Sequence, residues 1–203
     1  MDKVLEKHAL GSVWLALLDR LVTAGEEVGN EILEALNIYA SFYSTDNDIV
    51  LSELASSENI SEMRKVFFTR EQNSFGHSYK DSIVGPLGRN DFQDVIDLLK
   101  ENPDTKRALV TLVGNGKGKV PCINTVHFLV RKEGLIVNYF VRGQDVFNKY
   151  YADAIAISEM ADLVGRGLNL KVHRVTSMIS SAHIYLADLP KIREVLTLGR
   201  KYM

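Results

Sequence analysis

The sequence predicts an α+β fold in which a mixed sheet packs against helices. Segments with the 3.6-residue period of helices and segments with the two-residue alternation of strands both occur, and the second half is richer in strands. They do not follow one another in a strict strand–helix–strand order, so the class is α+β. The chain has 203 residues, 46% of them hydrophobic, with no repeat, low-complexity tract or linker. We therefore expect one domain over residues 1–203.

The first half of the chain predicts mainly helices. Residues 13–23 carry apolar side chains at helical spacing, and Gly25 marks the stop. Residues 45–65 are polar and predict a helix with irregular ends. Residues 91–100 predict another helix, which Asn90 or Asp91 caps. Between these helices, residues 36–42 alternate as a half-buried strand whose inward side chains are Leu36, Ile38, Ala40 and Phe42.

The second half predicts most of the sheet. Strands are expected over residues 108–113, 124–131, 135–142 and 170–180. The middle two are joined by a hairpin turn at residues 131–134. A helix over residues 151–165 is apolar on much of its surface and is expected to be deeply buried; its apolar residues include Ala154, Ile155, Ile157, Ala161 and Leu163. A last helix is expected over residues 181–192.

Composition excludes several classes of protein. Lysine and arginine total 24 against 26 aspartate and glutamate, so the net charge is −2 and no strong field attracts nucleic acid or a membrane surface. No apolar run approaches ~18 residues, and the first residues lack the apolar core of a secretory signal. The single cysteine excludes an internal disulfide framework and a multi-thiolate metal site. We expect a cytoplasmic protein without a metal, a nucleic-acid partner or a membrane partner.

The single cysteine, Cys122, is the first candidate for chemistry. Pro121 fixes the entry of the chain and leaves the cysteine at a strand edge. A lone cysteine is most often a small buried apolar residue. A nucleophilic thiol instead needs a lowered pKa, which a nearby arginine would provide.

Four short motifs give the chain a resemblance to a known family. They are Asn102-Pro103-Asp104-Thr105-Lys106-Arg107, Val120-Pro121-Cys122, Arg142-Gly143-Gln144-Asp145-Val146-Phe147 and Ala182-His183-Ile184-Tyr185. In this order and spacing they resemble the thymidylate synthase family, which includes the cytidylate hydroxymethylases. Upstream, Phe75-Gly76-His77-Ser78-Tyr79 is similar to a glycine-x-x-tyrosine segment of that family. The resemblance covers residues 75–188 well, and the ending is most similar to short archaeal members. It implies a mixed sheet with one face in a dimer interface.

The resemblance implies covalent catalysis on a pyrimidine nucleoside 5′-monophosphate. Cys122 matches the thiolate that adds to ring carbon 6, so that carbon 5 can attack a one-carbon unit from 5,10-methylenetetrahydrofolate. Arg142 matches the arginine that binds the nucleotide phosphate beside the thiol, and we expect it to activate the thiol. Tyr79 matches a tyrosine that moves a proton at carbon 5.

The pair Lys106 and Arg107 matches two arginines that reach the phosphate in the partner subunit. The resemblance therefore implies a homodimer with shared sites. Lysine at the first position keeps the charge and loses the two-pronged geometry of arginine. The plain alternative is a solvated basic pair before a strand.

Asp153 bears on which base is bound. In most of the family the matching residue is asparagine, whose donor and acceptor suit uracil; aspartate matches the cytidylate hydroxymethylases. A carboxylate accepts a hydrogen bond from the exocyclic amine of cytosine. Against the uracil carbonyl it would place acceptor against acceptor, at a cost of roughly 1–3 kcal/mol. The alternative is an aspartate that merely caps a helix.

The remaining matched residues surround the sugar and the folate. His183 and Tyr185 match the pair that holds the sugar 3′-hydroxyl, and at alternate positions of an extended segment both can point to one side. The alternative is two amphipathic residues at a strand end. Asp145 matches the aspartate that contacts the pterin of folate. Gly143 stands where a serine usually follows the phosphate arginine, so one phosphate contact is lost.

The chain also departs from the family pattern. No arginine occurs between Gly25 and Asn37, where the family has a phosphate-binding loop. The general-base glutamate does not align clearly; Glu53 and Glu62 are candidates, and Glu34 is a weaker one. Trp14, the single tryptophan, comes too early to match an active-site tryptophan. The C-terminal segment that closes over folate in full-length members is absent or is replaced by residues 192–203, and either would leave the site more open to water.

These features favour folate-dependent hydroxymethylation of CMP or dCMP, because water can attack the activated intermediate in an open site. A short thymidylate synthase that methylates dUMP is the first alternative. A nucleotide-binding relative with reduced or lost folate chemistry is the second. Chance similarity of the motifs is the least favoured reading, since order and spacing agree across four of them.

Overall fold

The structure is a computed structural model that describes residues 4–71, 78–86, 88, 92–114 and 120–202. The strands of this part of the chain are β1 (Val4–Glu6), β2 (Glu26–Val28), β3 (Ile32–Phe42), β4 (Ile83–Val84), β5 (Leu109–Leu112), β6 (Ile123–Arg131), β7 (Gly134–Val141), β8 (Gln144–Asp145) and β9 (Val172–Tyr185). The α-helices are α1 (Leu10–Ala24), α2 (Ile49–Leu54), α3 (Ser57–Phe68), α4 (Tyr79–Ser82), α5 (Gln93–Glu101), α6 (Tyr150–Leu168) and α7 (Leu189–Gly199). Two 3₁₀ turns, Leu186–Asp188 and Arg200–Tyr202, flank α7.

The strands form one mixed sheet. Its order is β1-β3-β9-β7-β6-β5-β4, with β2 beside β3 and β8 beside β9. β9 pairs antiparallel with β3 and parallel with β7, while β5, β6 and β7 form an antiparallel meander. This arrangement confirms the predicted class. Among the helices described, none is long and apolar enough to cross a membrane.

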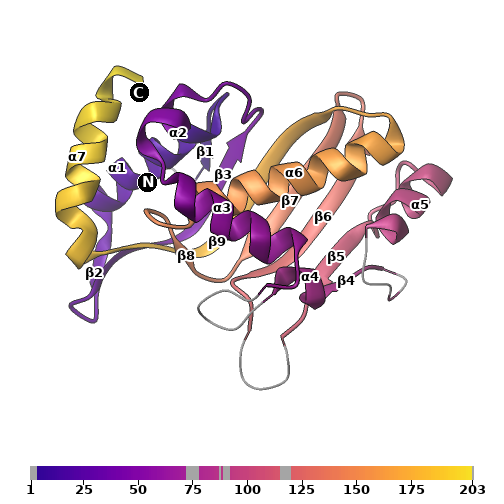
Figure 1. Ribbon diagram of the computed structural model, residues 1–203, viewed down its shortest axis with the longest axis horizontal. Coiled ribbons are helices and arrows are strands. Elements are labelled where there is room, and N and C mark those ends of the chain that lie inside the picture. Colours follow the sequence, from indigo (N-terminus) through magenta and orange to yellow (C-terminus); the bar gives the residue numbers. More distant parts are fainter. Residues whose placement is uncertain (1–3, 72–77, 87, 89–91, 115–119, 203) are drawn as a thin grey trace.

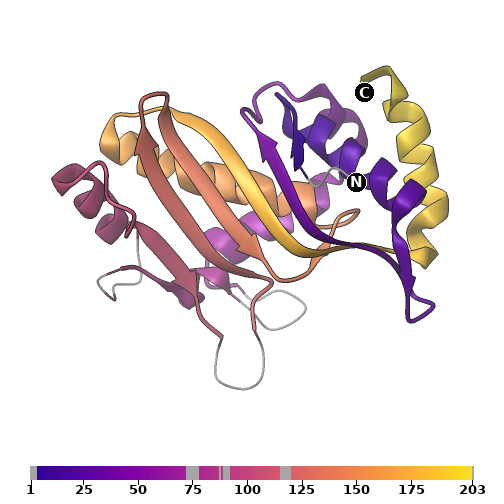
Figure 2. The same cartoon turned by 180° about the vertical axis from the view of Figure 1, so that it is seen from behind.

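Helices cover one face of the sheet. α3, α5 and α6 lie over it in Figure 1, and the same sheet seen from behind in Figure 2 shows β3, β9, β7, β6 and β5 with no helix across them. α6 contacts α1, α3 and α5 as well as β7 and β9, which explains why it is apolar on most of its surface. The prediction of a buried helix is thus confirmed, except that Leu163 is exposed.

Side chains alternate between the two faces along each strand. Ala40, Ser177 and Tyr139 are neighbours across β3, β9 and β7 and are buried beneath the helices. One residue along, Tyr39 and Phe140 flank Met178, and they are 44% and 41% exposed. The face without helices therefore carries a row of large apolar side chains.

Two predictions in the first half need correction. Leu36 is not an inward residue but 54% exposed, because Asn37 has φ 57° and interrupts the regular alternation of β3. The segment 45–65 holds two helices instead of one. Asp48 caps α2 by accepting from the Leu51 N–H, and Ser56 caps α3 by accepting from the Asn59 N–H.

The predicted last helix is wrong over its first part. Residues 181–185 continue β9, because they pair with the first residues of β3 and with β8. The helix begins only at Leu189. The hairpin at residues 131–134, the first helix and the other strands are confirmed within a few residues. Asn90 and Asp91, the proposed caps of α5, lie outside the described residues, as does the segment 75–77 with His77.

Candidate active site

Cys122 and Arg142 lie side by side at one end of the meander. Cys122 immediately precedes β6 and Arg142 immediately follows β7, and these strands run antiparallel with Ile123 opposite Val141. The Arg142 N–H donates to the Cys122 carbonyl at 2.9 Å. The guanidinium also donates to the carbonyls of Val120 and Pro121, at 2.9 and 3.2 Å. Arg142 is thereby anchored to the segment that leads into the cysteine.

The chain then returns toward β9 and α6. β8 pairs with the end of β9, with Gln144 opposite Ala182 and Asp145 opposite His183. Asp153 follows in the first turn of α6, where the helix dipole points toward it. The Gln144 side-chain amide donates to Asp153 Oδ2 at 2.9 Å. The elements β8, β9 and α6 thus bring polar side chains close to Cys122.

These side chains line one cavity of about 390 Å³. Its lining residues are Met63, Tyr79, Cys122, Arg142, Gly143, Gln144, Asp145, Lys149, Asp153, His183 and Tyr185. The size lies toward the lower end of the range for small-molecule sites, about 300–1,000 Å³. Most of the residues predicted from the sequence therefore converge on it. Met63, Gln144 and Lys149 were not predicted as site residues; only the position of Gln144 within a matched motif could have indicated it.

Three buried polar atoms of this cavity lining have no hydrogen-bond partner in the described part of the chain. They are Asp153 Oδ1, Gln144 Oε1 and His183 Nδ1. Leaving such an atom unpaired costs about 1–3 kcal/mol, so folded proteins rarely do it. Their concentration at one cavity is the pattern of a site whose polar groups are completed by a ligand.

Burial controls the charge of Asp153. Its side chain is 4% exposed, and desolvation raises its pKa to about 7. The Gln144 hydrogen bond and the Lys149 ammonium lower that pKa, and the nearby Asp145 carboxylate raises it. The carboxyl group can therefore change its protonation near neutral pH.

The thiol is less activated than the sequence predicted. Arg142 lowers the pKa of Cys122, as expected, but burial raises it by more, and the Asp153 carboxylate adds to the rise. Burial also raises the pKa of Tyr79, and its hydroxyl accepts backbone hydrogen bonds at Cys122 and Ile123. Tyr79 therefore holds its proton, beside the sulfur.

His183 and Tyr185 share one side of β9, as their spacing predicted, with ring centroids 5.6 Å apart. Asp145 lines the cavity, and both carboxylate oxygens accept from Asn148, one from the backbone N–H and one from the side chain. The next residue, Val146, accepts a bond of 2.9 Å from the indole N–H of Trp14. The single tryptophan thus anchors the backbone next to Asp145, a role that its sequence position did not indicate.

Several predicted residues lie away from the cavity. Lys106 and Arg107 are exposed, and the Lys106 carbonyl lies 3.0 Å from His127 Nε2, well along β6 from Cys122. None of the candidate glutamates lines the cavity. Glu62 pairs with Lys149 at 3.2 Å, Glu53 with Lys201 and Tyr202, and Glu34 with Ser181.

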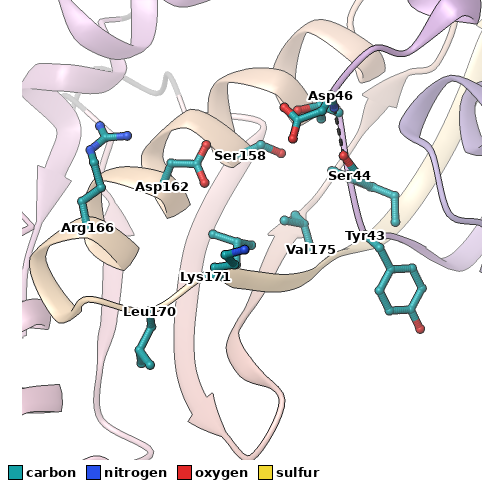
Figure 3. A pocket seen from close by; sticks show the side chains of 12 residues that line it. Tyr43, Ser44, Asp46, Ser158, Asp162, Arg166, Leu170, Lys171 and Val175 are labelled. Atoms are coloured by element: carbon teal, nitrogen blue, oxygen red, sulfur yellow. Dashed lines mark hydrogen bonds between the residues drawn. The ribbon is translucent and has the colours of Figure 1, made fainter.

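A second hollow of about 350 Å³ lies where β3, β9 and α6 meet. Figure 3 shows Asp162 and Arg166 of α6 on one side and Tyr43, Ser44 and Asp46 on the other. Asp162 and Arg166 are exposed, and the unpartnered atoms named above belong to the Cys122 cavity instead. The Cys122 cavity is therefore the candidate active site.

Comparison with known proteins gives a consistent set of similarities. A sequence model of the family described as thymidylate synthase matches residues 53–202. A protein of Methanothermobacter marburgensis with the name "Putative thymidylate synthase" is 21% identical over 210 residues, 92% of this chain and 94% of that protein. One of the same name from Methanococcoides burtonii is 24% identical over 207 residues, 97% of this chain and 95% of that protein. The thymidylate synthase of Mycoplasma mobile is 25% identical over 134 residues, which are 64% of this chain and 46% of that protein.

Proposed function

Because the chain belongs to the thymidylate synthase family, whose short archaeal members it resembles, we propose that it hydroxymethylates carbon 5 of CMP or dCMP. The family supports a one-carbon transfer to a pyrimidine nucleotide that depends on folate. The choice of cytosine and of the hydroxymethyl product is our proposal.

Asp153 is the observation that carries the choice of base. It lines the cavity, it is almost completely buried, and its Oδ1 atom has no partner among the described residues. An ionised carboxylate can only accept hydrogen bonds. It therefore suits the exocyclic amine of cytosine and opposes the carbonyl of uracil at the same position.

The chemistry assigned to the chain begins at Cys122. Its thiolate forms a bond to ring carbon 6, which moves an electron pair onto carbon 5 and makes that carbon nucleophilic. Carbon 5 would then bond to the one-carbon unit and lose its hydrogen as a proton, while the bond between that unit and its carrier would break. Water would add its hydroxyl to the one-carbon unit as the sulfur–carbon bond breaks, which restores the ring and the thiolate, and the protons from carbon 5 and from water would pass to the carrier. Tyr79 keeps its proton beside the sulfur and is our candidate for the proton transfers at carbon 5. Arg142 would hold the phosphate.

The cavity residues fit the pterin end of a folate. Asp145 presents its carboxylate there, and although both oxygens accept from Asn148, each has a further lone pair for a ring N–H. When bound, methylenetetrahydrofolate supplies the one-carbon unit. Met63 also lines the cavity.

The position of α7 supports the hydroxymethyl product. α7 contacts α1 and α2, and the turn that follows it is tied down where Tyr202 donates to Glu53 at 2.8 Å. No residue of α7 lines the cavity. This position of α7 favours attack by water on the one-carbon unit, which would yield a hydroxymethyl group.

A homodimer formed through the uncovered sheet face completes this proposal. The row of Tyr39, Met178 and Phe140 supplies an apolar surface of the kind that interfaces bury. Lys106 and Arg107, exposed and outside the cavity of their own chain, would then serve the partner. Mixing inactive Cys122→Ala protein with an inactive Lys106→Ala/Arg107→Ala double variant tests this. Sites shared between subunits would restore part of the activity, whereas no recovery in verified mixed dimers would contradict the sharing.

Tritium release from C5-labelled CMP, dCMP and dUMP tests the function. Each nucleotide is assayed with and without methylenetetrahydrofolate, and Cys122→Ala is the blank. We expect release from a cytidine nucleotide that needs Cys122 and increases with folate. Release from dUMP alone would instead assign thymidylate synthesis and remove the role of Asp153. Nucleotide binding without release from any substrate would indicate a binding protein that lacks this chemistry.

A further inference from the structure

The bond between Gln144 and Asp153 is the least expected feature of the cavity. Gln144 belongs to β8, is 2% exposed, and directs its side-chain Nε2 to Asp153 Oδ2 at 2.9 Å. A weaker contact of 3.5 Å joins the same nitrogen to the Asp145 carbonyl. Both residues line the cavity, and each has one oxygen without a hydrogen-bond partner among the described residues, Gln144 Oε1 and Asp153 Oδ1.

The chemistry of an amide makes this bond directional. The amide nitrogen carries two donors and no acceptor, so the atom that faces it must accept. Asp153 Oδ2 is therefore held as an acceptor in either protonation state of the carboxyl group. When Asp153 takes up a proton, the proton goes to Oδ1, the oxygen that has no partner in the part of the chain that the structure describes.

We propose that Gln144 is a positioning residue for Asp153. Its side-chain amide holds Oδ2 as an acceptor, so that Oδ1, with any proton on the carboxyl group, faces the pyrimidine ring. The inference rests on the proposed function only for the identity of the ring. An ionised Oδ1 would accept from the exocyclic amine of cytosine, and a protonated Oδ1 would donate to its ring nitrogen N3. Without Gln144, either oxygen could carry the proton and either could turn toward the ring.

Other groups around Asp153 shape the same titration. Lys149, one turn earlier at the start of α6, lowers the pKa of Asp153, and Asp145 of β8 raises it. Tyr79 of α4, Cys122 before β6 and Tyr139 of β7 also face the carboxyl group electrostatically. Gln144 differs from all of these because it is the group that donates a short hydrogen bond to the carboxyl group itself.

The test is a carbon-13 NMR titration of the Asp153 carboxyl group in the full chain, without nucleotide, assigned by its loss in Asp153→Asn. Gln144→Met keeps the length of the side chain and removes the donor. We expect the midpoint of the titration to rise by about one pH unit, roughly a tenfold increase in proton affinity, because the bond to the anion is lost. Tyr150→Phe is the matched control: it removes a buried hydroxyl that contacts Ser177 and not Asp153, and the midpoint should stay.

An unchanged midpoint in folded Gln144→Met protein would overturn the inference. If that variant does not fold, Gln144→Glu provides the second test. In this variant two neighbouring carboxyl groups share one proton over part of the pH range. We therefore expect the pair to titrate in two separate steps. A single step at the wild-type midpoint would again overturn the inference.

Nucleotide binding separates this inference from the proposed function. If wild-type protein prefers cytidine nucleotides and Gln144→Met reduces that preference along with the shifted midpoint, both stand. If the midpoint shifts but wild-type protein binds no cytidine nucleotide, the proposed function fails and the role of Gln144 stands. If cytidine nucleotides bind equally well to both proteins and the midpoints coincide, the role of Gln144 fails alone.

Discussion

Replacing Asp153 by asparagine should change how the stability of the protein depends on pH. Burial raises the pKa of Asp153 to about 7 in the folded protein, from an ordinary value of 3.8. The folded state therefore binds this proton more tightly than the unfolded state does. By linkage, the contribution of Asp153 to stability is greatest below pH ~4 and falls as the pH rises to ~7.

The size of the effect follows from the two pKa values. Each pH unit between them corresponds to 1.36 kcal/mol, so ionising Asp153 costs the folded state at most about 4 kcal/mol by pH 8. Asparagine has nearly the same shape and does not titrate. Relative to wild type, Asp153→Asn should therefore gain stability as the pH rises, by roughly 2–4 kcal/mol between pH 4.5 and 8.

The assay is urea denaturation of wild type and variant at several pH values in the absence of nucleotide. The difference between the two free energies of unfolding is the relevant quantity, because other titrating groups contribute equally to both proteins. Exchange of the exposed Asp104 for asparagine is the control, and it should give a difference that barely changes over this pH range. If the difference for Asp153→Asn were also constant across this range, the burial argument would be refuted.

Three further predictions concern neighbours of the cavity. Gly143 has open space where a Cβ would stand, so the fold should tolerate Gly143→Ser. The new hydroxyl adds a donor near the phosphate arginine and should tighten nucleotide binding about threefold to tenfold, as measured by calorimetry. Weaker binding would contradict this. Because Arg142 lowers the pKa of Cys122, Arg142→Leu should slow alkylation of the thiol at pH 7.5 by roughly threefold to tenfold, and equal rates would argue against the coupling. Trp14→Phe leaves the carbonyl of Val146 without its donor and should lower the free energy of unfolding by about 1–3 kcal/mol in urea, a loss that unchanged stability would exclude.

Much of the local structure could be predicted because it is encoded by neighbouring residues. The periodicity of α1 and α6 and the two-residue turn between β6 and β7 appear directly in the sequence. The same holds for the order of the matched motifs, which predicted the family and most of the cavity lining. Chemical identity, such as a thiol at residue 122 or a carboxyl group at residue 153, is also a property of the sequence alone.

The tertiary structure decided what depends on partners far along the chain. For residues 181–185 the sequence supported two conflicting expectations, the start of a helix and, from the matched motif, an extended segment. Pairing with β3 and β8 makes them strand, and this carries His183 and Tyr185 to the cavity. The role of Trp14 arises from a bond across 132 residues. These outcomes depend on pairing energies that no short window of sequence contains.

The pKa shifts in the site also depend partly on the sequence and partly on the tertiary structure. The sequence predicted that Arg142 would lower the pKa of Cys122, and the direction of that effect is confirmed. The pKa of Cys122 is nevertheless raised, because burial raises it by more than Arg142 lowers it. Burial is determined by the whole fold. For the same reason the pairing of Gln144 with Asp153 was not predicted: residue types are set by the sequence, whereas the distance between two side chains and their separation from water are set only by the folded chain.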